Sequence, residues 1–263
     1  MSSAITQLSA LPTVSLADLN EQASLQTRVD RKYILRAADV AAVLAELPEG
    51  AAILEIDGER ALRYASHYYD TPRFDSYLGA AHGRRRRFKV RSRTYVDSGG
   101  SFLEVKTRGG RSATVKDRVP VIDESLDDNG VRYAAEMLAD AGIPAAGRIA
   151  HGLQPVLETR YRRATLLLAP EAGEASTASR ATIDIELEWA DANGTRMSLP
   201  GAVIIETKSG QRAGALDRAL WRHHHRPAKI SKYGTGLAAL RPDLPSNKWR
   251  RVLTEHFPQA IAA

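Results

Sequence analysis

The chain has 263 residues, of which 43% are hydrophobic and 26% are charged. These values are ordinary for a protein with a buried core, and they exclude collagen-like, fibrous and wholly disordered chains. The absence of cysteine excludes disulfides, thiolate metal sites and cysteine nucleophiles. No stretch reaches the ~20 apolar residues that a membrane span requires, and the N-terminus lacks the pattern of a secretory signal. We therefore expect a cytoplasmic protein with no membrane span of its own.

The first 24 residues are small and polar, and we expect an N-terminal arm or a short leading helix there. Residues 27–35 alternate in the manner of a strand, although Arg31 falls on the apolar face. The spacing predicts a helix over 38–47 and further helices over 130–141, 213–225, 233–240 and 246–256. The other predicted strands are 61–69, 84–95, 101–108, 112–121, 155–168, 180–190 and 202–208.

Eight strands with few long helices between them indicate a largely antiparallel sheet. We predict an α+β fold for residues 25–263: a single domain made of an eight-stranded antiparallel β-barrel with helices packed on the outside. Two glycine pairs, Gly99-Gly100 and Gly109-Gly110, are expected to form hairpin turns. The small residues of 170–179 are expected to form a loop between two strands.

The net charge is a modest +6, but the cations are unevenly placed. The strands over 101–108, 180–190 and 202–208 each have one apolar and one ionic face. A sheet with one face in water explains one such strand, whereas repetition in several strands favours a barrel with charges in its interior. Buried charges need counter-ions, so the expected content is a polyanion with a divalent metal. In the 84–95 strand, the residues on one face are Arg85, Arg87, Lys89, Arg91 and Arg93.

An ordered set of motifs runs through most of the chain. Over residues 25–240 this set resembles the polyphosphate polymerase domains of the vacuolar transporter chaperone (VTC) family, which belongs to the triphosphate tunnel metalloenzymes. The resemblance implies an eight-stranded barrel that binds a triphosphate and transfers the γ-phosphoryl group of ATP to inorganic polyphosphate, with Mn²⁺ or Mg²⁺ as cofactor. Any membrane partner would be a separate protein. The motifs are RVDRKY, YYDTP, FKVRSRTY, FLEVKTR, VKDRVPV, PVLETRYRRATL, RATIDIEL, AVIIETK and PAKISKYGTGL.

The resemblance also implies roles for individual residues. Phosphoryl transfer needs positioning and charge neutralisation, which the fork of Arg and the point charge of Lys supply. Glu206 is the implied metal ligand, with Glu104 or Glu188 as a second, because hard divalent cations prefer carboxylate oxygen. The implied phosphate-binding residues are Lys32, Arg91, Arg93, Lys106, Lys116, Arg163, Arg180, Lys229 and Lys232. The match of Arg163 is open to a register shift, because Arg160 and Arg162 are close to it in the sequence.

Two other functions remain open: a tripolyphosphatase or organic triphosphate hydrolase of the same fold, and a non-catalytic polyphosphate-binding module. Hydrolases of this kind carry an E-x-E-x-K motif in the first strand. Here the corresponding residues are Arg28, Asp30 and Lys32, which favours the polymerase.

Three further clusters have simpler interpretations. Residues 84–87 indicate a tunnel mouth rather than a nucleic-acid site, because the single aromatic residue Phe88 gives no stacking platform. The three histidines of 223–225 are expected at a helix C-terminus, since adjacent helical residues point in different directions. The acidic residues Asp184, Glu186 and Glu188 are expected to pair with luminal cations rather than to form a metal cluster.

Overall fold

The computed structural model describes residues 7–23, 29–108, 114–170, 178–257 and 261–262. The chain divides into two compact units, each assembled from separated segments. Strands β8 (Gln154–Leu168) and β9 (Ser179–Asp191) contribute residues to both units, and β4 (Leu62–Asp70) lies in unit 2 except for its first residue, Leu62. Unit 1 comprises the described residues of Met1–Leu62, Tyr161–Leu187 and Leu199–Ile230, and unit 2 those of Arg63–Arg160, Glu188–Ser198 and Ser231–Ala263.

Unit 1 is built around three neighbouring strands. Strand β11 lies between β2 and β9 and is antiparallel to both, so that Glu206 stands opposite Lys32 on one side and opposite Thr182 on the other. Strand β3 pairs antiparallel with β8 and parallel with β1. Besides its parts of β8 and β9, the unit contains β1 (Thr13–Val14), α2 (Leu16–Gln22), β2 (Val29–Arg36), α3 (Ala37–Leu44), β3 (Ala52–Leu54), β11 (Ala202–Ser209) and α7 (Ala215–Arg222).

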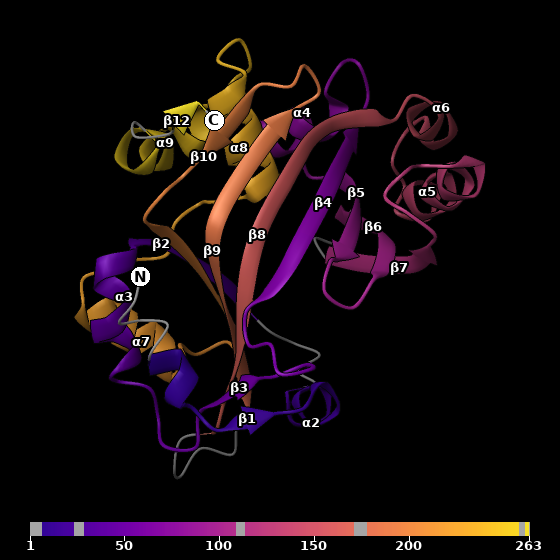
Figure 1. Ribbon diagram of the computed structural model, residues 1–263. Helices are drawn as coiled ribbons and strands as arrows, with labels where there is room; N and C mark the ends of the chain where they lie inside the picture. The colour runs from indigo at the N-terminus through magenta and orange to yellow at the C-terminus, as the bar shows by residue number, and fades with distance from the viewer. Residues whose placement is uncertain (1–6, 24–28, 109–113, 171–177, 258–260, 263) are drawn as a thin grey trace. The chain divides into compact units, whose positions relative to one another are not determined.

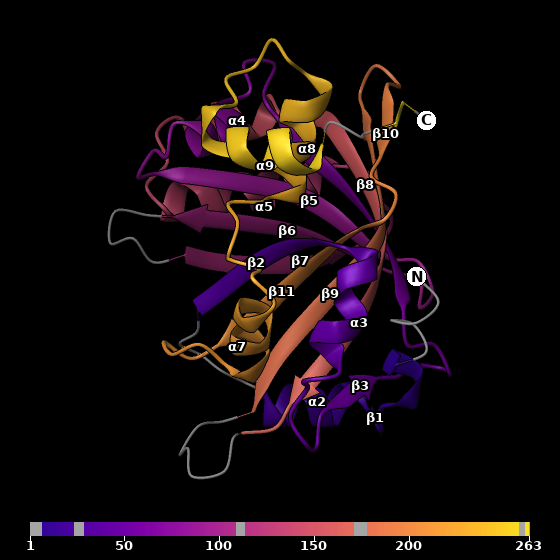
Figure 2. The same ribbon diagram turned by 90° about the vertical axis from the view of Figure 1, so that its left-hand side faces the viewer.

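Helices α3 and α7 cover the apolar face of these strands (Figure 2). Strand residues Tyr33, Ile183 and Ile205 are at most 2% exposed and belong to one core cluster with Val43 of α3 and Leu220 of α7. Because side chains alternate along a strand, the residues between them form the opposite, ionic face. The predicted division into an apolar and an ionic face is therefore present in this unit.

A buried polar cluster explains why Arg31 stands on the apolar face. The guanidinium of Arg31 donates a hydrogen bond to Ser209 at 2.9 Å and lies 3.5 Å from the Asp217 carboxylate. Asp217 is fully buried and also accepts hydrogen bonds from the hydroxyls of Tyr33 and Thr207, at 2.7 and 2.5 Å. A buried carboxylate requires such partners, so Arg31 completes a cluster that ties helix α7 to the sheet.

Unit 2 contains the longer antiparallel series. Strands β4, β5, β6 and β7 pair in that order, and β10 pairs with the end of β9 and with β12. Besides its parts of β8 and β9, the unit contains β4 (Leu62–Asp70), α4 (Asp75–Ala81), β5 (Arg87–Tyr95), β6 (Gly100–Arg108), β7 (Thr114–Val121), α5 (Asp128–Asp140), α6 (Ala146–His151), β10 (Arg196–Ser198), α8 (Lys232–Leu240), the 3-10 helix η1 (Asn247–Trp249), α9 (Arg250–His256) and β12 (Ile261–Ala262).

Helices α5 and α6 cover the apolar face of β5 and β6 (Figure 1). Val90 and Val105 of the strands are at most 1% exposed and cluster with Leu138 of α5 and Ala150 of α6. As in unit 1, the alternate strand residues are ionic and face away from these helices. Each unit thus has one helix-covered face and one charged face.

The predicted α+β class, with eight principal antiparallel strands and helices on the outside, is confirmed. The hydrogen-bonded order is β2-β11-β9-β8-β4-β5-β6-β7, an order consistent with the predicted barrel. In the described part of the chain β2 and β7 are end strands of this series, so hydrogen bonds do not close it. The prediction of a single domain over 25–263 stays a prediction.

The structure also differs from the expected elements. Helices α4 and α6 and the short strands β1, β3, β10 and β12 were not predicted, because each is too short to show a period. The N-terminal arm holds helix α2 and strand β1. Gly99 has a φ of +74° in the β5–β6 hairpin, as expected of a turn glycine. Gly109-Gly110 and most of the 170–179 loop lie outside the described residues. No helix in the described ranges is long and apolar enough to cross a membrane.

Candidate functional site: two charged sheet faces

Cations dominate the ionic face of β5, β6 and β7 in unit 2. The strand registers place Lys89, Lys106 and Lys116 directly opposite one another in one row. Arg87 stands opposite Arg108 in the neighbouring row. Like charges directly opposite each other destabilise a sheet, so this arrangement requires compensating negative charge.

The carboxylate of Glu104 lies at the centre of this face and is only 2% exposed. It accepts a hydrogen bond from Arg91 Nε at 2.7 Å and lies 2.9 Å from Lys116 Nζ and 3.6 Å from Arg93 Nη1. Burial raises the pKa of Glu104, but the three cations outweigh burial and hold the pKa well below its usual range. We call Glu104, Arg91, Arg93 and Lys116 the Glu104 cluster. It joins four of the residues implied by the resemblance.

The Glu104 cluster does not neutralise the positive charge around it. Burial and the charges of Arg93 and Arg91 lower the pKa of Lys116, even though Glu104 acts in the opposite direction. In the described part of the chain, the buried Nε atoms of Arg93 and Arg108 have no hydrogen-bond partner. Buried donors without acceptors are rare in folded proteins. The two guanidinium groups are therefore incompletely paired on a face that already holds more positive than negative charge.

Tyr68 is a member of this site that the sequence analysis did not identify. Its hydroxyl accepts a hydrogen bond from Arg91 Nη1 at 3.1 Å, and its ring lies 5.5 Å from Lys89 Nζ. Both contacts restrict the positions of the cations. The neighbouring Tyr69 belongs instead to the apolar core under α5. Alternation along the YYDTP motif predicts that the two tyrosines lie on opposite faces of the strand. It does not predict which of them lies on the ionic face, because a tyrosine can be buried on either face.

The ionic face of unit 1 holds Glu206 and Lys32. Lys32 Nζ lies 2.7 Å from Glu206 Oε2, and the Glu206 side chain is 16% exposed. Burial raises the pKa of Glu206, whereas Lys32, Lys208 and Arg163 together hold it well below its usual range. Glu206 is therefore ionised at neutral pH, as a metal ligand must be.

Arg163 is the β8 arginine that belongs to this face. Its guanidinium makes two hydrogen bonds to the Asp184 carboxylate, at 2.6 and 2.8 Å. Arg162 instead donates to the Ala61 carbonyl and lies 3.7 Å from Glu186. Glu186 has a left-handed φ of 53°, which interrupts the extended backbone of β9 at this point. Arg163 thus lies on the ionic face, its role in phosphate binding stays a prediction, and Asp184 is a partner of a cation.

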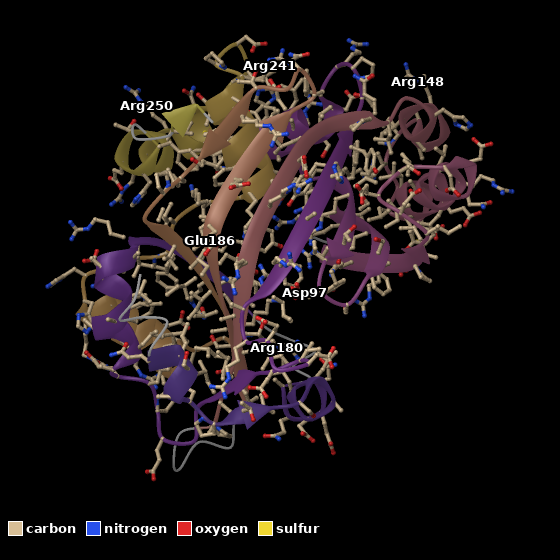
Figure 3. All side chains as sticks on the ribbon, viewed as in Figure 1. Asp97, Arg148, Arg180, Glu186, Arg241 and Arg250 are labelled. Carbon is tan, nitrogen blue, oxygen red and sulfur yellow. The ribbon has the colours of Figure 1, made fainter. Side chains whose placement is uncertain are left out.

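Arg180 contacts the N-terminal arm. It stands opposite Lys208 in the register of β9 and β11. Its Nη2 donates to the backbone carbonyls of Leu19 and Ala23, both at 3.3 Å, at the end of helix α2 (Figure 3 labels Arg180). A cation at a helix C-terminus is favourable, so Arg180 has a structural role that the sequence analysis did not anticipate.

The two lysines near the end of the matched motifs are placed by different backbone contacts. The N–H of Ala228 donates to the Lys32 carbonyl at 2.7 Å, which holds the exposed Lys229 beside β2. Lys232 is the first residue of α8, and its carbonyl accepts a hydrogen bond from Trp189 Nε1 at 2.9 Å. Lys229 belongs to unit 1 and Lys232 to unit 2.

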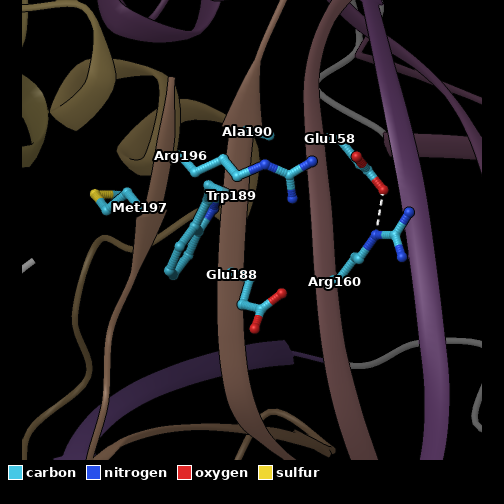
Figure 4. Close-up of a pocket in the computed structure, with 7 residues that line it drawn as sticks. All are labelled: Glu158, Arg160, Glu188, Trp189, Ala190, Arg196 and Met197. Carbon is cyan, nitrogen blue, oxygen red and sulfur yellow. Dashed lines mark hydrogen bonds and ion pairs between the residues drawn. The ribbon is translucent and has the colours of Figure 1, made fainter. Parts of the chain in front are cut away.

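The three predicted carboxylate ligands have different environments. Glu104 forms ion pairs with three basic side chains. Glu188 is exposed in a small cavity of about 140 Å³ in unit 2 (Figure 4). Near Glu206, the buried Thr182 Oγ1 has no hydrogen-bond partner among the described residues. In the same residues no group of three or more His, Asp or Glu side chains could hold a metal. Mg²⁺ commonly binds one or two carboxylates together with substrate phosphates, and Glu206 fits that mode.

The histidines and the remaining ionic residues can also be placed. Helix α7 ends at Arg222, and His223 contacts Glu46 at 2.6 Å, which agrees with the predicted helix C-terminus. Lys89 and Lys208 are additional cations on the two ionic faces. Period-two spacing in the sequence already places both on ionic faces, whereas nothing in the sequence distinguished Thr182 from other strand threonines.

Comparisons with known proteins identify the family. The family described as the VTC domain matches residues 27–241. A search of curated proteins returns no match. Among solved structures, the chain is similar to the PH1819 protein from Pyrococcus horikoshii OT3, with 14% identity over 82% of this chain and 98% of that chain and a TM-score of 0.43. It is also similar to the HpAC1 protein from Hippeastrum, with 12% identity over 84% and 99% and a TM-score of 0.42. On the strength of the sequence match, this chain belongs to the VTC domain family.

Proposed function

We propose that this protein is a metal-dependent polyphosphate polymerase that uses ATP. An oxygen of the terminal phosphate of a polyphosphate chain attacks the γ-phosphorus of ATP. The new P–O bond extends the chain by one phosphoanhydride, and the bond to the β-phosphate oxygen breaks. ADP leaves with that electron pair, so the reaction consumes neither water nor an oxidant. Membership of the VTC domain family supports a function with polyphosphate or triphosphate.

The observation that carries this proposal is the excess of cations on the ionic face of unit 2. The phosphate oxygens of a substrate would supply negative charge between the opposed lysines and beside the arginines of this face. Arginine forks and lysines held before the substrate arrives stabilise charge on the transferring oxygens without reorganisation. The carboxylate of Glu104 holds Arg91 and Lys116 in place for this role.

A divalent cation would be held by Glu206. A bound Mn²⁺ or Mg²⁺ supplies neutralisation of charge on phosphate oxygens. Lys32 contacts one oxygen of Glu206 and orients the carboxylate, and the nearby Thr182 hydroxyl is an available oxygen donor. Glu188 lies in a separate exposed pocket of unit 2 and is not part of this proposal.

The test is incubation of the purified protein with ATP and MnCl₂, followed by a gel stained for polyphosphate and an assay of ADP. A polyphosphate ladder with an equal amount of ADP is the expected result. Release of inorganic phosphate from tripolyphosphate without a ladder would identify a hydrolase. Salt-sensitive polyphosphate binding without turnover would identify a binding module.

A matched pair of variants ties the activity to the proposed face. Lys106→Ala removes a cation from the row opposite Lys89, and the expected loss of polymerase rate is roughly 100-fold. Lys248→Ala removes an exposed lysine that contacts the Ala80 carbonyl, and should leave the rate unchanged. Equal effects of the two variants would contradict the assignment.

A further inference from the structure

A second basic site lies elsewhere in unit 2, in a cavity of about 520 Å³. It is enclosed by the loop after β4, helix α4, the segment leading into β5, and helix α6. Arginines from three separate segments line it, and Figure 3 labels the one on α6. These arginines, here called the pocket arginines, are Arg73, Arg84, Arg86, Arg87 and Arg148.

The pocket arginines have no carboxylate partner in the part of the chain that the structure describes, whereas about half of the other arginines described do. Elsewhere, guanidinium groups contact carboxylates, as in Arg63 with Asp97 at 2.6 Å and Arg222 with Glu46. Among the described residues, no carboxylate lies within 4.0 Å of any pocket arginine. Four of the five are exposed to water, which screens their mutual repulsion, so an anion that enters the pocket meets positive charge not already paired with a carboxylate.

The carboxylate that does line the cavity is engaged by another group. Asp75 Oδ2 accepts a hydrogen bond from the Thr71 hydroxyl at 2.7 Å, and Thr71 Oγ1 in turn accepts from the Asp75 N–H. This reciprocal pair stabilises the first turn of α4. It holds Asp75 at the start of the helix, and no ion pair joins Asp75 to a pocket arginine among the described residues.

At the inner side of the pocket, burial and charge repulsion both disfavour the charged form of Arg87. Arg87 is half-buried, and its Nη1 donates to the Arg84 carbonyl at 2.7 Å. Burial and the charge of Arg108 on the adjacent strand both lower the pKa of Arg87. An anion bound beside Arg87 would raise that pKa again, because its charge opposes the repulsion from Arg108.

The remaining lining of the cavity is apolar. Phe88, Ile143 and Ile149 contribute side chains to it, together with two prolines. Ligand sites are commonly concave, largely apolar and supplied with a few convergent polar groups. The volume falls within the ~300–1,000 Å³ range of small-molecule pockets, so more than a single ion can enter.

The pocket is separate from the Glu104 cluster. Arg87 and Arg91 lie four residues apart on β5, which corresponds to about 13 Å along an extended strand. A ligand in the pocket therefore reaches Arg87 at the end of the ionic face, but not Arg91, Arg93 or Lys116, which surround Glu104. The tunnel mouth expected at residues 84–87 stays a prediction, and Arg84 and Arg86 lie on the wall of this cavity.

We propose that this pocket is a second binding site for an oligophosphate, a ligand with two or more linked phosphoryl groups. Several guanidinium groups around one cavity match several linked phosphates better than one inorganic ion, because each fork binds two oxygens. The oligophosphate can be an inorganic chain or the phosphate tail of a nucleotide. The site does not depend on the polymerase reaction proposed above.

Calorimetric titration with tripolyphosphate, and separately with ATP, tests this site. The variant Arg73→Glu/Arg148→Glu changes two exposed side chains outside the strands, so the fold should survive. Wild-type protein should bind tripolyphosphate at two classes of site, and this variant should weaken one class by roughly tenfold or more. The milder Arg73→Gln/Arg148→Gln variant should show a smaller loss in the same class. Tighter binding of tripolyphosphate than of ATP would identify an inorganic chain as the source, and the reverse a nucleotide.

Two controls make the result decisive. Arg250→Glu changes an exposed arginine on α9 of the same unit and should leave both classes unchanged. Lys106→Ala/Lys116→Ala removes cations from the strand face and should spare the pocket class, so the pocket can be tested even if no polymerase activity is found. An unaltered isotherm in Arg73→Glu/Arg148→Glu, an equal loss in Arg250→Glu, or displacement of tripolyphosphate by single-stranded RNA at lower concentration would overturn the proposal.

Discussion

The hydroxyl of Tyr233 donates a 2.5 Å hydrogen bond to the carboxylate of Asp70, which is fully buried. Asp70 also accepts from the backbone N–H groups of Thr71, Ser76 and Tyr77. The ring of Tyr233 stacks on Tyr68 at 5.1 Å. The YYDTP motif and the KYGTG motif are thus parts of one buried cluster, which holds α8, and Lys232 at its start, against β4.

Replacing Tyr233 by Phe should therefore destabilise the protein. The variant leaves a buried carboxylate without one donor, and we expect a loss of about 1–3 kcal/mol in the free energy of unfolding. Tyr77→Phe is the matched control, because the hydroxyl of that buried residue donates to a neutral carbonyl, that of Pro245, at 3.1 Å. Urea denaturation of both variants gives the comparison. A loss in Tyr77→Phe as large as in Tyr233→Phe would argue against a special role for Asp70.

Close packing of α8 predicts the effect of a single methyl group. A Cβ at Gly236 would lie 2.3 Å from ring atoms of Trp189, which is itself buried. Gly236→Ala should cost about 1–3 kcal/mol through overpacking. In Gly147→Ala, on α6, a Cβ meets nothing within 4 Å, so this variant should be neutral or slightly stabilising. Thermal unfolding distinguishes the two, and similar melting temperatures would contradict the packing argument.

Removal of the Glu104 carboxylate should destabilise the protein, because the cations of the Glu104 cluster then repel one another. Glu104→Gln leaves Arg91, Arg93 and Lys116 close together without a counter-charge, and the expected destabilisation is about 3–5 kcal/mol. Tripolyphosphate should raise the melting temperature of this variant more than that of the wild type, because the added anion replaces the lost charge. Glu136→Gln, at an exposed position on α5, is the control. Equal stabilisation of all three proteins by tripolyphosphate would be evidence against an anion site at this face.

The same carboxylates predict the behaviour of the protein in acid. The pKa values of Glu104 and Glu206 are lower in the folded than in the unfolded state. Their contribution to stability is therefore fully present above the unfolded pKa of about 4.3, and it is lost as the pH falls below that value. Denaturant titrations between about pH 5 and about pH 3 should show this loss, with a shallower dependence for Glu104→Gln. An identical slope in the variant would mean that other groups control acid unfolding.

The choice among the carboxylates predicted to bind metal can be decided by two glutamine variants. Glu206→Gln keeps the size of the side chain but removes the charge beside Lys32, and should lower metal-dependent turnover at least about 100-fold. Glu188→Gln changes an exposed residue and should leave turnover near the wild-type value. Rates measured over a range of MnCl₂ concentrations test both. If Glu188→Gln were the inactive variant, the metal site would have to be reassigned.

Much of the architecture could be predicted from the sequence, because strand alternation is a local property. The apolar residues Tyr33, Val90 and Ile205 do face helices, and Lys32, Glu104 and Glu206 do lie on the opposite faces. Family membership could likewise be inferred from the order of the motifs.

The tertiary structure decided which charges meet. Arg162 and Arg163 are adjacent in one strand and point to opposite faces, where packing gives Arg163 the Asp184 carboxylate and Arg162 the Ala61 carbonyl and Glu186. Arg180 reaches carbonyls of helix α2 that lie some 160 residues earlier in the chain. The pocket arginines become neighbours because turns and short helices bring three segments together. Alternation specifies the face on which a side chain lies, whereas its partner depends on strand register, backbone irregularities and loop paths, which are set by packing over the whole unit.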